Sequence, residues 1–142
     1  MKAKPFLIYF FALAGLIGLA SIYYSATIEP AHKTITSSVS PDGKFRAVRV
    51  SLAMDGEKPF CRDSVAVLLA VYPEHFAEKN KAYEVYSAPC DAPGRRDASP
   101  RIAWESATVL RIVPPVVVAG AKPPMMKRRD VTKSVRVSFA AD

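Results

Sequence analysis

The sequence predicts a mainly β, or α+β, protein: an N-terminal transmembrane helix followed by a small antiparallel β-sheet domain with at most one short helix. Three observations support this fold class. Residues Phe6–Tyr24 carry no charged side chain and directly follow Lys2 and Lys4. After Thr27 the chain consists of short segments in which apolar and polar residues alternate, a pattern typical of strands. Twelve prolines favour strands joined by turns over a helical bundle.

The chain divides into three parts at the ends of these patterns. Residues 1–26 form a cytoplasmic tip and a membrane helix, residues 27–33 a tether, and residues 34–142 an extracytoplasmic β domain. The third part is long enough to bury a core without help from a cofactor.

The uncharged stretch Phe6–Tyr24 has the length of a membrane span. Its nineteen residues would extend roughly 28 Å as a helix, close to the ~30 Å hydrocarbon core of a bilayer. The basic tip places the N-terminus in the cytoplasm and the rest of the chain outside it. We therefore expect a signal anchor in a bacterial inner membrane, with the β domain in the periplasm. Cleavage after Ala20 is the alternative, because Gly18 and Ala20 are small residues at the −3 and −1 positions.

Small residues recur along this stretch at spacings of three and four, which places them in one stripe of a helix. A stripe of this kind lets a second helix approach closely, so self-association or contact with another envelope protein is one interpretation. The other is that such residues are common in apolar segments. The stripe consists of Ala14, Gly18, Ser21 and Ser25.

The first strands form the clearest local prediction. Thr34–Val39 is β-prone and polar, as an edge strand would be. Ser40–Lys44 follows with Pro, Asp and Gly in the order that a tight turn requires. Phe45–Ala53 then alternates, so we predict a β-hairpin with one apolar and one polar face. The apolar face holds Val48, Val50 and Leu52, and the other face holds Arg49 and Ser51.

The middle of the chain predicts a central strand and its neighbour. Ser64–Tyr72 is apolar on both faces, which indicates a strand covered on two sides, although a short buried helix has the same pattern. Pro73–Lys79 has proline at a helix-start position and is at most two helical turns. Ala82–Ser87 alternates again.

Cys61 and Cys90 both lie in the exported part of the chain, so an oxidising compartment favours a disulfide between them. Two buried free thiols, or a metal site, are the alternatives; no CxxC pair or nearby histidine supports a metal site. If Ser64–Tyr72 and Ala82–Ser87 pair antiparallel with the cysteines opposite each other, partner numbers sum to 151. Val65 then faces Tyr86, Val67 faces Glu84 and Leu68 faces Tyr83. Such a bridge should stabilise the fold by roughly 3 kcal/mol.

The last third of the chain predicts a second group of strands. Asp91–Pro100 is a solvent loop, and Arg101–Glu105 and Ala107–Val113 are strands around a tight turn. Trp104 is expected to anchor the core. Val116–Ala119 lies between two Pro-Pro pairs and is either an edge segment or an exposed loop. Ser134–Phe139 alternates, with Val135, Val137 and Phe139 facing inward and Arg136 outward.

The sequence contains no G-x-S-x-G elbow, no Walker A loop, no G-x-G-x-x-G, no H-E-x-x-H and no Ca loop. His32 and His75 are most simply exposed polar residues, and the carboxylates mostly adjoin turns. We therefore expect no catalytic residues, no cofactor and no metal site. An exported domain also makes nucleic acid a poor partner.

The densest charge on the chain follows the second Pro-Pro pair. It has two interpretations: a solvated basic loop, or a surface that contacts anionic headgroups or an acidic partner. The candidate contact residues are Lys122, Lys127, Arg128, Arg129 and Lys133.

The turn Ser40–Lys44 resembles the hairpin turns of periplasmic β-propeller blades of the TolB type, but it occurs once here and a propeller needs repeats. The wider layout resembles a loose group of small, uncharacterised bacterial membrane-anchored proteins. The shared features are the apolar N-terminal segment, the SPDGK hairpin, a Cys before an apolar strand, and a Trp strand before a β-branched one, here Cys61, Trp104 and Thr108–Val113. Arg62 stands where that group commonly has Gly. The resemblance implies architecture and location only.

Together these patterns predict a single-pass membrane-anchored extracytoplasmic domain with a non-enzymatic interaction or envelope-accessory role. The first alternative is a soluble periplasmic or secreted binding protein released by cleavage after Ala20. The second is a small envelope enzyme.

Overall fold

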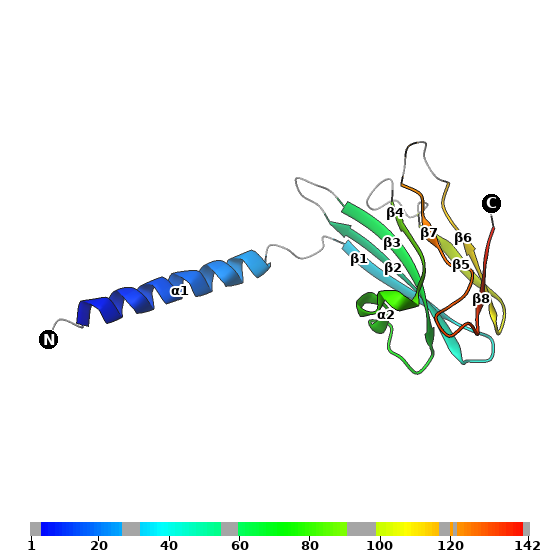
Figure 1. Cartoon of the computed structure of the whole chain (residues 1–142), viewed down its shortest axis with the longest axis horizontal. Helices are drawn as coiled ribbons and strands as arrows, with labels where there is room; N and C mark the ends of the chain where they lie inside the picture. Colours follow the sequence, from blue (N-terminus) through cyan, green and yellow to red (C-terminus); the bar gives the residue numbers. More distant parts are fainter. Residues whose placement is uncertain are drawn as a thin grey trace.

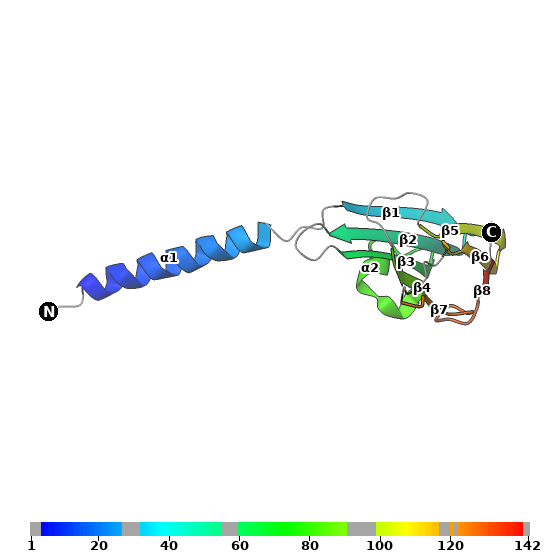
Figure 2. The same ribbon diagram turned by 90° about the horizontal axis from the view of Figure 1, so that it is seen from above.

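The computed structural model describes residues 4–26, 32–54, 60–90, 99–116, 120 and 122–140. Helix α1 (Lys4–Ala26) stands apart from a domain built of two β-sheets (Figures 1 and 2). The strands are β1 (His32–Val39), β2 (Phe45–Met54), β3 (Phe60–Leu69), β4 (Glu84–Pro89), β5 (Arg101–Ser106), β6 (Val109–Val113), β7 (Met125–Met126) and β8 (Arg136–Phe139). The first sheet has the order β1-β2-β3-β4-β7 and the second β5-β6-β8. The predicted mainly β fold with an antiparallel sheet is confirmed.

A helix, α1, covers the stretch that the sequence predicts as a transmembrane span. Within α1, the side chains of Tyr9 and of residues 11–22 are described, and all of them are exposed. None of the helices in the described part of the chain has both the length and the apolar character needed to cross a membrane.

The β1–β2 hairpin forms at the predicted turn, but the strand face predicted as polar is the one that faces the second sheet. Ala47 lies in the core there, and Arg49 and Ser51 form hydrogen bonds with Pro100 and Asp63. Gly43 adopts the left-handed φ of 73° that favours glycine, and its amide donates to the Ser40 carbonyl over 2.8 Å. The Asp42 carboxylate accepts hydrogen bonds from the Ser40 hydroxyl (2.7 Å) and the Lys44 amide (3.2 Å). β1 lies at the edge of its sheet, as predicted, but begins at His32, within the range predicted as a tether.

β3 is the central strand that the sequence predicts, covered on both faces. Val65 and Val67 belong to the core between the two sheets, together with Leu110 and Ile112 of β6. Ala66 and Leu68 pack on the opposite face against helix α2 (Phe76–Lys79), in a second apolar cluster. The strand ends at Leu69 rather than Tyr72, because the Tyr72 amide turns back to the Leu69 carbonyl.

The predicted pairing of β3 with β4 is correct over its first half. Val65 faces Tyr86, in the register whose partner numbers sum to 151. A bulge between Val65 and Ala66 then shifts the register, so that Glu84 faces Ala66 instead of Val67. The bulge places both Val85 and Tyr86 in the core between the sheets, which regular alternation would not allow. Tyr83 does not face Leu68, because it lies in the 3₁₀ turn η1 (Lys81–Tyr83) before β4.

The second sheet corrects three predictions. Pro100, the last residue of the predicted solvent loop Asp91–Pro100, is buried, and its carbonyl accepts a hydrogen bond (3.0 Å) from the Arg49 guanidinium of the first sheet. Residues 91–98 of that loop lie outside the described residues. The β5–β6 turn lies at Ala107–Thr108, two residues later than predicted. β8 runs parallel to β6, whereas an antiparallel partner was expected. The parallel pairing arises because the chain crosses to the first sheet as β7 and turns once more before it returns.

Trp104 anchors the core as predicted, but it also connects the sheets. Its ring packs against the cluster between the sheets, and its indole N–H donates to the Ser38 carbonyl of β1 over 3.1 Å. Arg49 and Trp104 thus join the sheets through side chains along the β1–β5 side.

The opposite side of the domain is joined through the backbone. Residues 125–130, which we call the corner segment, pair first with β4 and then with β8. Met126 faces Tyr86, and the Lys127 amide donates to the Val85 carbonyl over 2.8 Å. At the next residue, the Val137 amide donates to the Arg128 carbonyl over 2.9 Å, and Arg129 then bridges Arg136. The corner segment therefore belongs to both sheets.

Asp130 fixes the turn between the corner segment and β8. Its side chain is buried and accepts hydrogen bonds from the amides of Val135 (2.8 Å) and Thr132 (3.0 Å), and from the Thr132 hydroxyl. The Lys133 amide donates to the Asp130 carbonyl, and Lys133 adopts a left-handed φ of 62°. A carboxylate that satisfies several turn donors defines the geometry of the whole turn.

We expect Asp130→Ala to destabilise the domain by about 2–3 kcal/mol, because it leaves buried amide donors without an acceptor. Thermal or denaturant unfolding of the full chain in detergent measures the loss. Asp42→Ala, which removes the exposed turn carboxylate of the β1–β2 hairpin, is the matched control and should lose less. An equal loss from both substitutions would contradict the assigned role of Asp130.

Candidate functional site

The residues predicted as a basic contact surface lie in two places. Lys122 belongs to the irregular segment between β6 and β7, whereas the other four lie on or just after the corner segment. All five side chains are exposed. The five charges therefore do not form one surface patch fixed by a single element.

The structure adds a residue that the sequence did not connect with this cluster. Arg136 was expected only as an outward-facing strand residue, but its backbone bridges Arg129 across the Asp130 turn. The flanking hydrogen bonds run from Val137 to Arg128 and from Asp130 to Val135. Arg129 and Arg136 therefore form a non-hydrogen-bonded antiparallel pair, in which the Cα atoms are only about 4.5 Å apart and side chains are closest.

A cleft of about 430 Å³, which we call the arginine cleft, lies beside this pair. Its lining residues are Arg128, Arg129, Arg136, Val137, Ser138 and Phe139. Among the described residues, no ion pair joins any of the three arginines to an acid. The nearest carboxylate in sequence, Asp130, is occupied by the donors of its own turn. The cleft thus combines three cations with no acidic partner.

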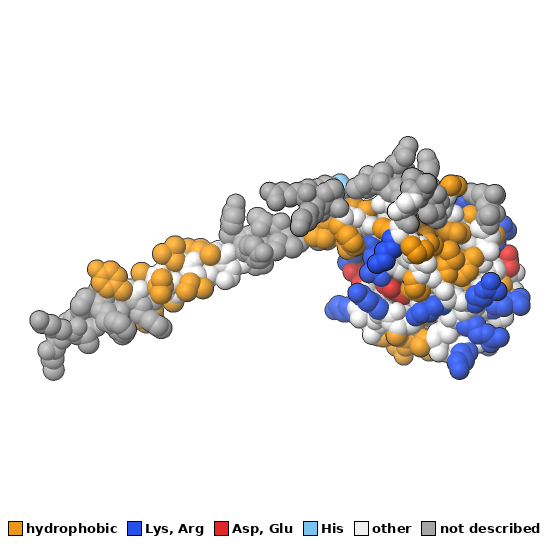
Figure 3. Space-filling model, turned by 45° about the horizontal axis from the view of Figure 1, so that its top comes forward, with side chains coloured by type: hydrophobic (Ala, Val, Ile, Leu, Met, Phe, Trp, Pro, Cys, Tyr) orange, Lys and Arg blue, Asp and Glu red, His pale blue; other side chains and the backbone are white. Residues whose placement is uncertain are grey.

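The arginine cleft lies at the end of the sandwich opposite to the start of β1. The Arg136 amide donates to the carbonyl of Thr108 in the β5–β6 turn, and Trp104 near that turn bonds Ser38 near the end of β1. Since β1 begins at His32, the chain enters the domain at the other end. On the face drawn in Figure 3, Lys and Arg side chains are more numerous on the half of the domain that is farther from α1.

The predicted disulfide is present at the end where the chain enters. Cys61 and Cys90 are bonded, with their Cα atoms 5.1 Å apart, and the Cys90 amide donates to the Cys61 carbonyl over 3.1 Å. The two cysteines are therefore opposed in the register that the sequence predicted. The alternatives of free thiols and of a metal site are wrong.

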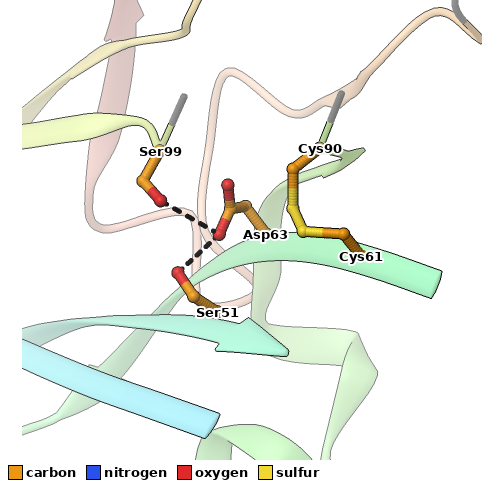
Figure 4. Close-up of a disulfide and its surroundings, with 5 residues drawn as sticks. All are labelled: Ser51, Cys61, Asp63, Cys90 and Ser99. Carbon is orange, nitrogen blue, oxygen red and sulfur yellow. Dashed lines mark hydrogen bonds between the residues drawn. A yellow bond between two sulfur atoms is a disulfide. The ribbon is translucent and has the colours of Figure 1, made fainter. Parts of the chain in front are cut away.

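A buried carboxylate that the sequence did not single out lies beside the disulfide (Figure 4). Asp63 accepts hydrogen bonds from the hydroxyls of Ser51 (2.5 Å) and Ser99 (3.4 Å). Burial raises the pKa of the Asp63 carboxyl, and these hydroxyls and the charge of Arg49 oppose that shift. Burial also raises the pKa of Tyr86 to about 12, and the Asp63 charge acts in the same direction.

Arg62, which departs from the resembled group's glycine, has a structural role. Its guanidinium donates to a Glu84 carboxylate oxygen over 3.0 Å and to the Ser87 hydroxyl over 2.8 Å. These contacts tie β3 to β4 on the face that carries α2. The same contacts require a long cationic side chain, which glycine could not supply.

The structure shows where the other residues singled out from the sequence lie, but these contacts do not test their predicted roles. Ala14, Gly18 and Ser21 lie on α1, and apart from the neighbouring residues and the helix's own backbone no heavy atom lies within 4 Å of where a Gly18 Cβ would be. The side chain of Ser25 and the segment Val117–Ala119 lie outside the described residues, while Val116 is irregular and 89% exposed. His32 and His75 are exposed. Among the described residues, no group of three or more His, Cys, Asp or Glu could hold a metal ion.

Comparison with known proteins leaves the chain without an assigned relative. No protein-family model matches it, and neither a curated protein nor a solved structure shows significant similarity. Function therefore has to be argued from the residues themselves.

We expect loss of the disulfide to lower the free energy of unfolding by roughly 3 kcal/mol, because the bond closes a loop of 29 residues. Denaturant unfolding of the Cys61→Ala, Cys90→Ala double variant against wild type measures it. Each single variant should lose about as much as the double. An additive loss, or none, would contradict this contribution.

Asp63→Asn should stabilise the domain at neutral pH, because the amide keeps an acceptor for both serines and removes a buried charge. The folded-state pKa of Asp63 lies above its ordinary value of 3.8, so folding takes up a proton between the two values. The wild type therefore gains stability relative to this variant as pH falls, and the difference closes below about 3.8.

Urea unfolding of both proteins from pH 7 to pH 3 checks this dependence. Asp42→Asn is the matched control of opposite sign. The Ser40 hydroxyl holds the pKa of Asp42 below its ordinary value, so that substitution should cost stability at neutral pH and nothing at low pH. A less stable Asp63→Asn protein at pH 7 would show that the Asp63 charge is needed.

Proposed function

We propose that this protein is a single-span, membrane-anchored extracytoplasmic domain with a non-enzymatic interaction role in a bacterial envelope. The observation that carries the proposal is the uncharged stretch Phe6–Tyr24, preceded by Lys2 and Lys4. Its length matches the hydrocarbon core, and its charge asymmetry favours a cytoplasmic N-terminus.

Two features of the structure support this reading. The large apolar side chains described on α1 are 60–74% exposed, so no part of the described domain covers them. In water this surface would be unfavourable, and burial in lipid would remove the cost. The Cys61–Cys90 disulfide also suits an oxidising compartment.

The basic surface favours an anionic partner over the headgroups of the anchoring membrane. Lys127, Arg128, Arg129 and Lys133 lie on or beside the corner segment, at the end opposite to the entry of the chain at His32. A domain tethered at His32 presents this end away from the tether. The interaction we propose is therefore with an acidic envelope component reached by the far end of the domain.

Release by cleavage after Ala20 and a small envelope enzyme remain the alternatives. A protein released by cleavage after Ala20 would have a lower mass than the full-length chain and would not stay in the membrane fraction. The enzyme would require convergent catalytic groups; the described histidines are exposed, and Asp63 is enclosed by serines and Arg49.

We expect the full-length protein to stay in the membrane fraction after alkaline carbonate extraction, with an intact mass that includes residues 1–20. Leu16→Arg, which places a charge in the middle of the uncharged stretch, should move the protein to the soluble fraction or prevent its export. Leu16→Ile is the matched control and should behave as wild type.

A wild-type protein that lacks its first twenty residues would contradict the anchor and establish release.

Crosslinking in intact cells identifies what the far end of the domain contacts. Charge reversal at Arg128 and Arg129 should remove that crosslink, whereas reversal at Lys44 should not.

A further inference from the structure

We propose that the arginine cleft binds a phosphate-type oxyanion. This inference rests on the proposed interaction role of the basic surface and names the chemical class that it recognises. The groups concerned are the guanidinium groups of Arg128, Arg129 and Arg136 and the hydroxyl of Ser138.

Arg129 and Arg136 form a cross-strand pair of like charges. Like charges placed directly opposite in an antiparallel pair destabilise a sheet, and the non-hydrogen-bonded pairing brings them closest. The backbone bonds from Val137 to Arg128 and from Asp130 to Val135 fix this pairing. Nothing described in the fold offsets the repulsion, because neither arginine has an acidic partner there. A bound anion would offset it.

Ser138 provides an observation that does not depend on charge. The residue lines the same cleft as the arginines, and its Oγ is buried and has no hydrogen-bond partner among the described residues. A buried hydroxyl without a partner costs free energy, whereas a ligand oxygen in the cleft could accept its hydrogen bond.

The donor geometry of arginine and the size of the cleft indicate the shape of the ligand. Arginine presents a planar fork of donors that suits the oxygens of phosphate and carboxylate, and several arginines around one site favour a multiply charged group. A cleft of about 430 Å³ exceeds the size of a bare phosphate. The cleft therefore suits a phosphate ester with an organic group attached, and Phe139 in the lining offers an apolar contact for that group.

The neighbouring charges do not block such a ligand. Asp130, the closest acid along the chain, is buried and holds the donors of Thr132 and Val135. Arg111 lies beside Ser138 on the adjacent strand, and its guanidinium is 4.0 Å from the Glu105 carboxylate on the far side of β6. The field around Ser138 thus stays positive.

The test uses the full chain in neutral maltoside micelles, with unfolding followed by the fluorescence of the single tryptophan. Inorganic phosphate should raise the melting temperature above that in chloride of equal ionic strength, because a ligand of the folded state stabilises it. Arg129→Gln and Arg136→Gln should each bind phosphate at least about tenfold more weakly. Ser138→Ala should bind it about fivefold more weakly.

A second readout separates binding from a merely structural role. Without phosphate, Arg129→Gln and Arg136→Gln should melt no lower than wild type, because each removes the like-charge pair. Lys44→Gln removes one positive charge from an exposed residue that belongs neither to the basic surface nor to the cleft lining, and it should keep the full phosphate response.

The source of the phosphate is resolved by two further probes. A response to glucose 6-phosphate and not to glucose indicates a soluble or glycan-borne ester, and a response confined to micelles that contain phosphatidylglycerol indicates a lipid headgroup. Equal melting temperatures of wild type in phosphate, in both ester probes and in chloride would overturn the proposal. So would an equal loss of response in Lys44→Gln. Neither result would bear on the proposed membrane anchor, because fractionation and intact mass test that anchor separately.

Discussion

The two sheets depend on the backbone hydrogen bonds of the corner segment. A strand edge leaves a row of amides and carbonyls that must find partners. Residues 125–127 satisfy part of the β4 edge, and residues 128–130 satisfy part of the β8 edge. One short segment therefore fixes the position of β8, and with it the arginine cleft. Residues 127–129, which the sequence predicts as a contact surface, therefore also form the connection between the two sheets.

Alternating patterns predicted the elements well where one face or both faces are apolar. Ser40–Lys44, the central strand around Val65 and the Cys61–Cys90 register all follow from local chemistry, so the sequence was sufficient for them. The bulge at Val65 and Ala66 was not predictable, because it follows from how Val85 and Tyr86 fill the space between two sheets. β7 was missed for a similar reason: two residues pair there only because β4 offers an open edge.

For the candidate site, too, some features could be predicted from the sequence and others could not. Five basic residues are visible in the sequence as a cluster of charge, and the structure places Lys122 on a different segment from the other four. Arg136 and Ser138 could not be joined to them from spacing alone, because the Asp130 turn and the parallel pairing of β8 with β6 bring them together. Asp63 was missed because a carboxylate in an alternating strand usually faces solvent, whereas here the inner face turns polar beside the disulfide.

The position of β1 has a mechanical consequence. β1 is an edge strand, and eight successive residues from His32 to Val39 pair with β2. If α1 is held in a membrane while the far end is held by a partner, tension enters at His32 and runs along the strand axis. All the β1–β2 hydrogen bonds then bear the load together, instead of opening one after another as in a hairpin pulled apart from its open end. The chain thus enters its domain in a geometry in which many hydrogen bonds share an applied force.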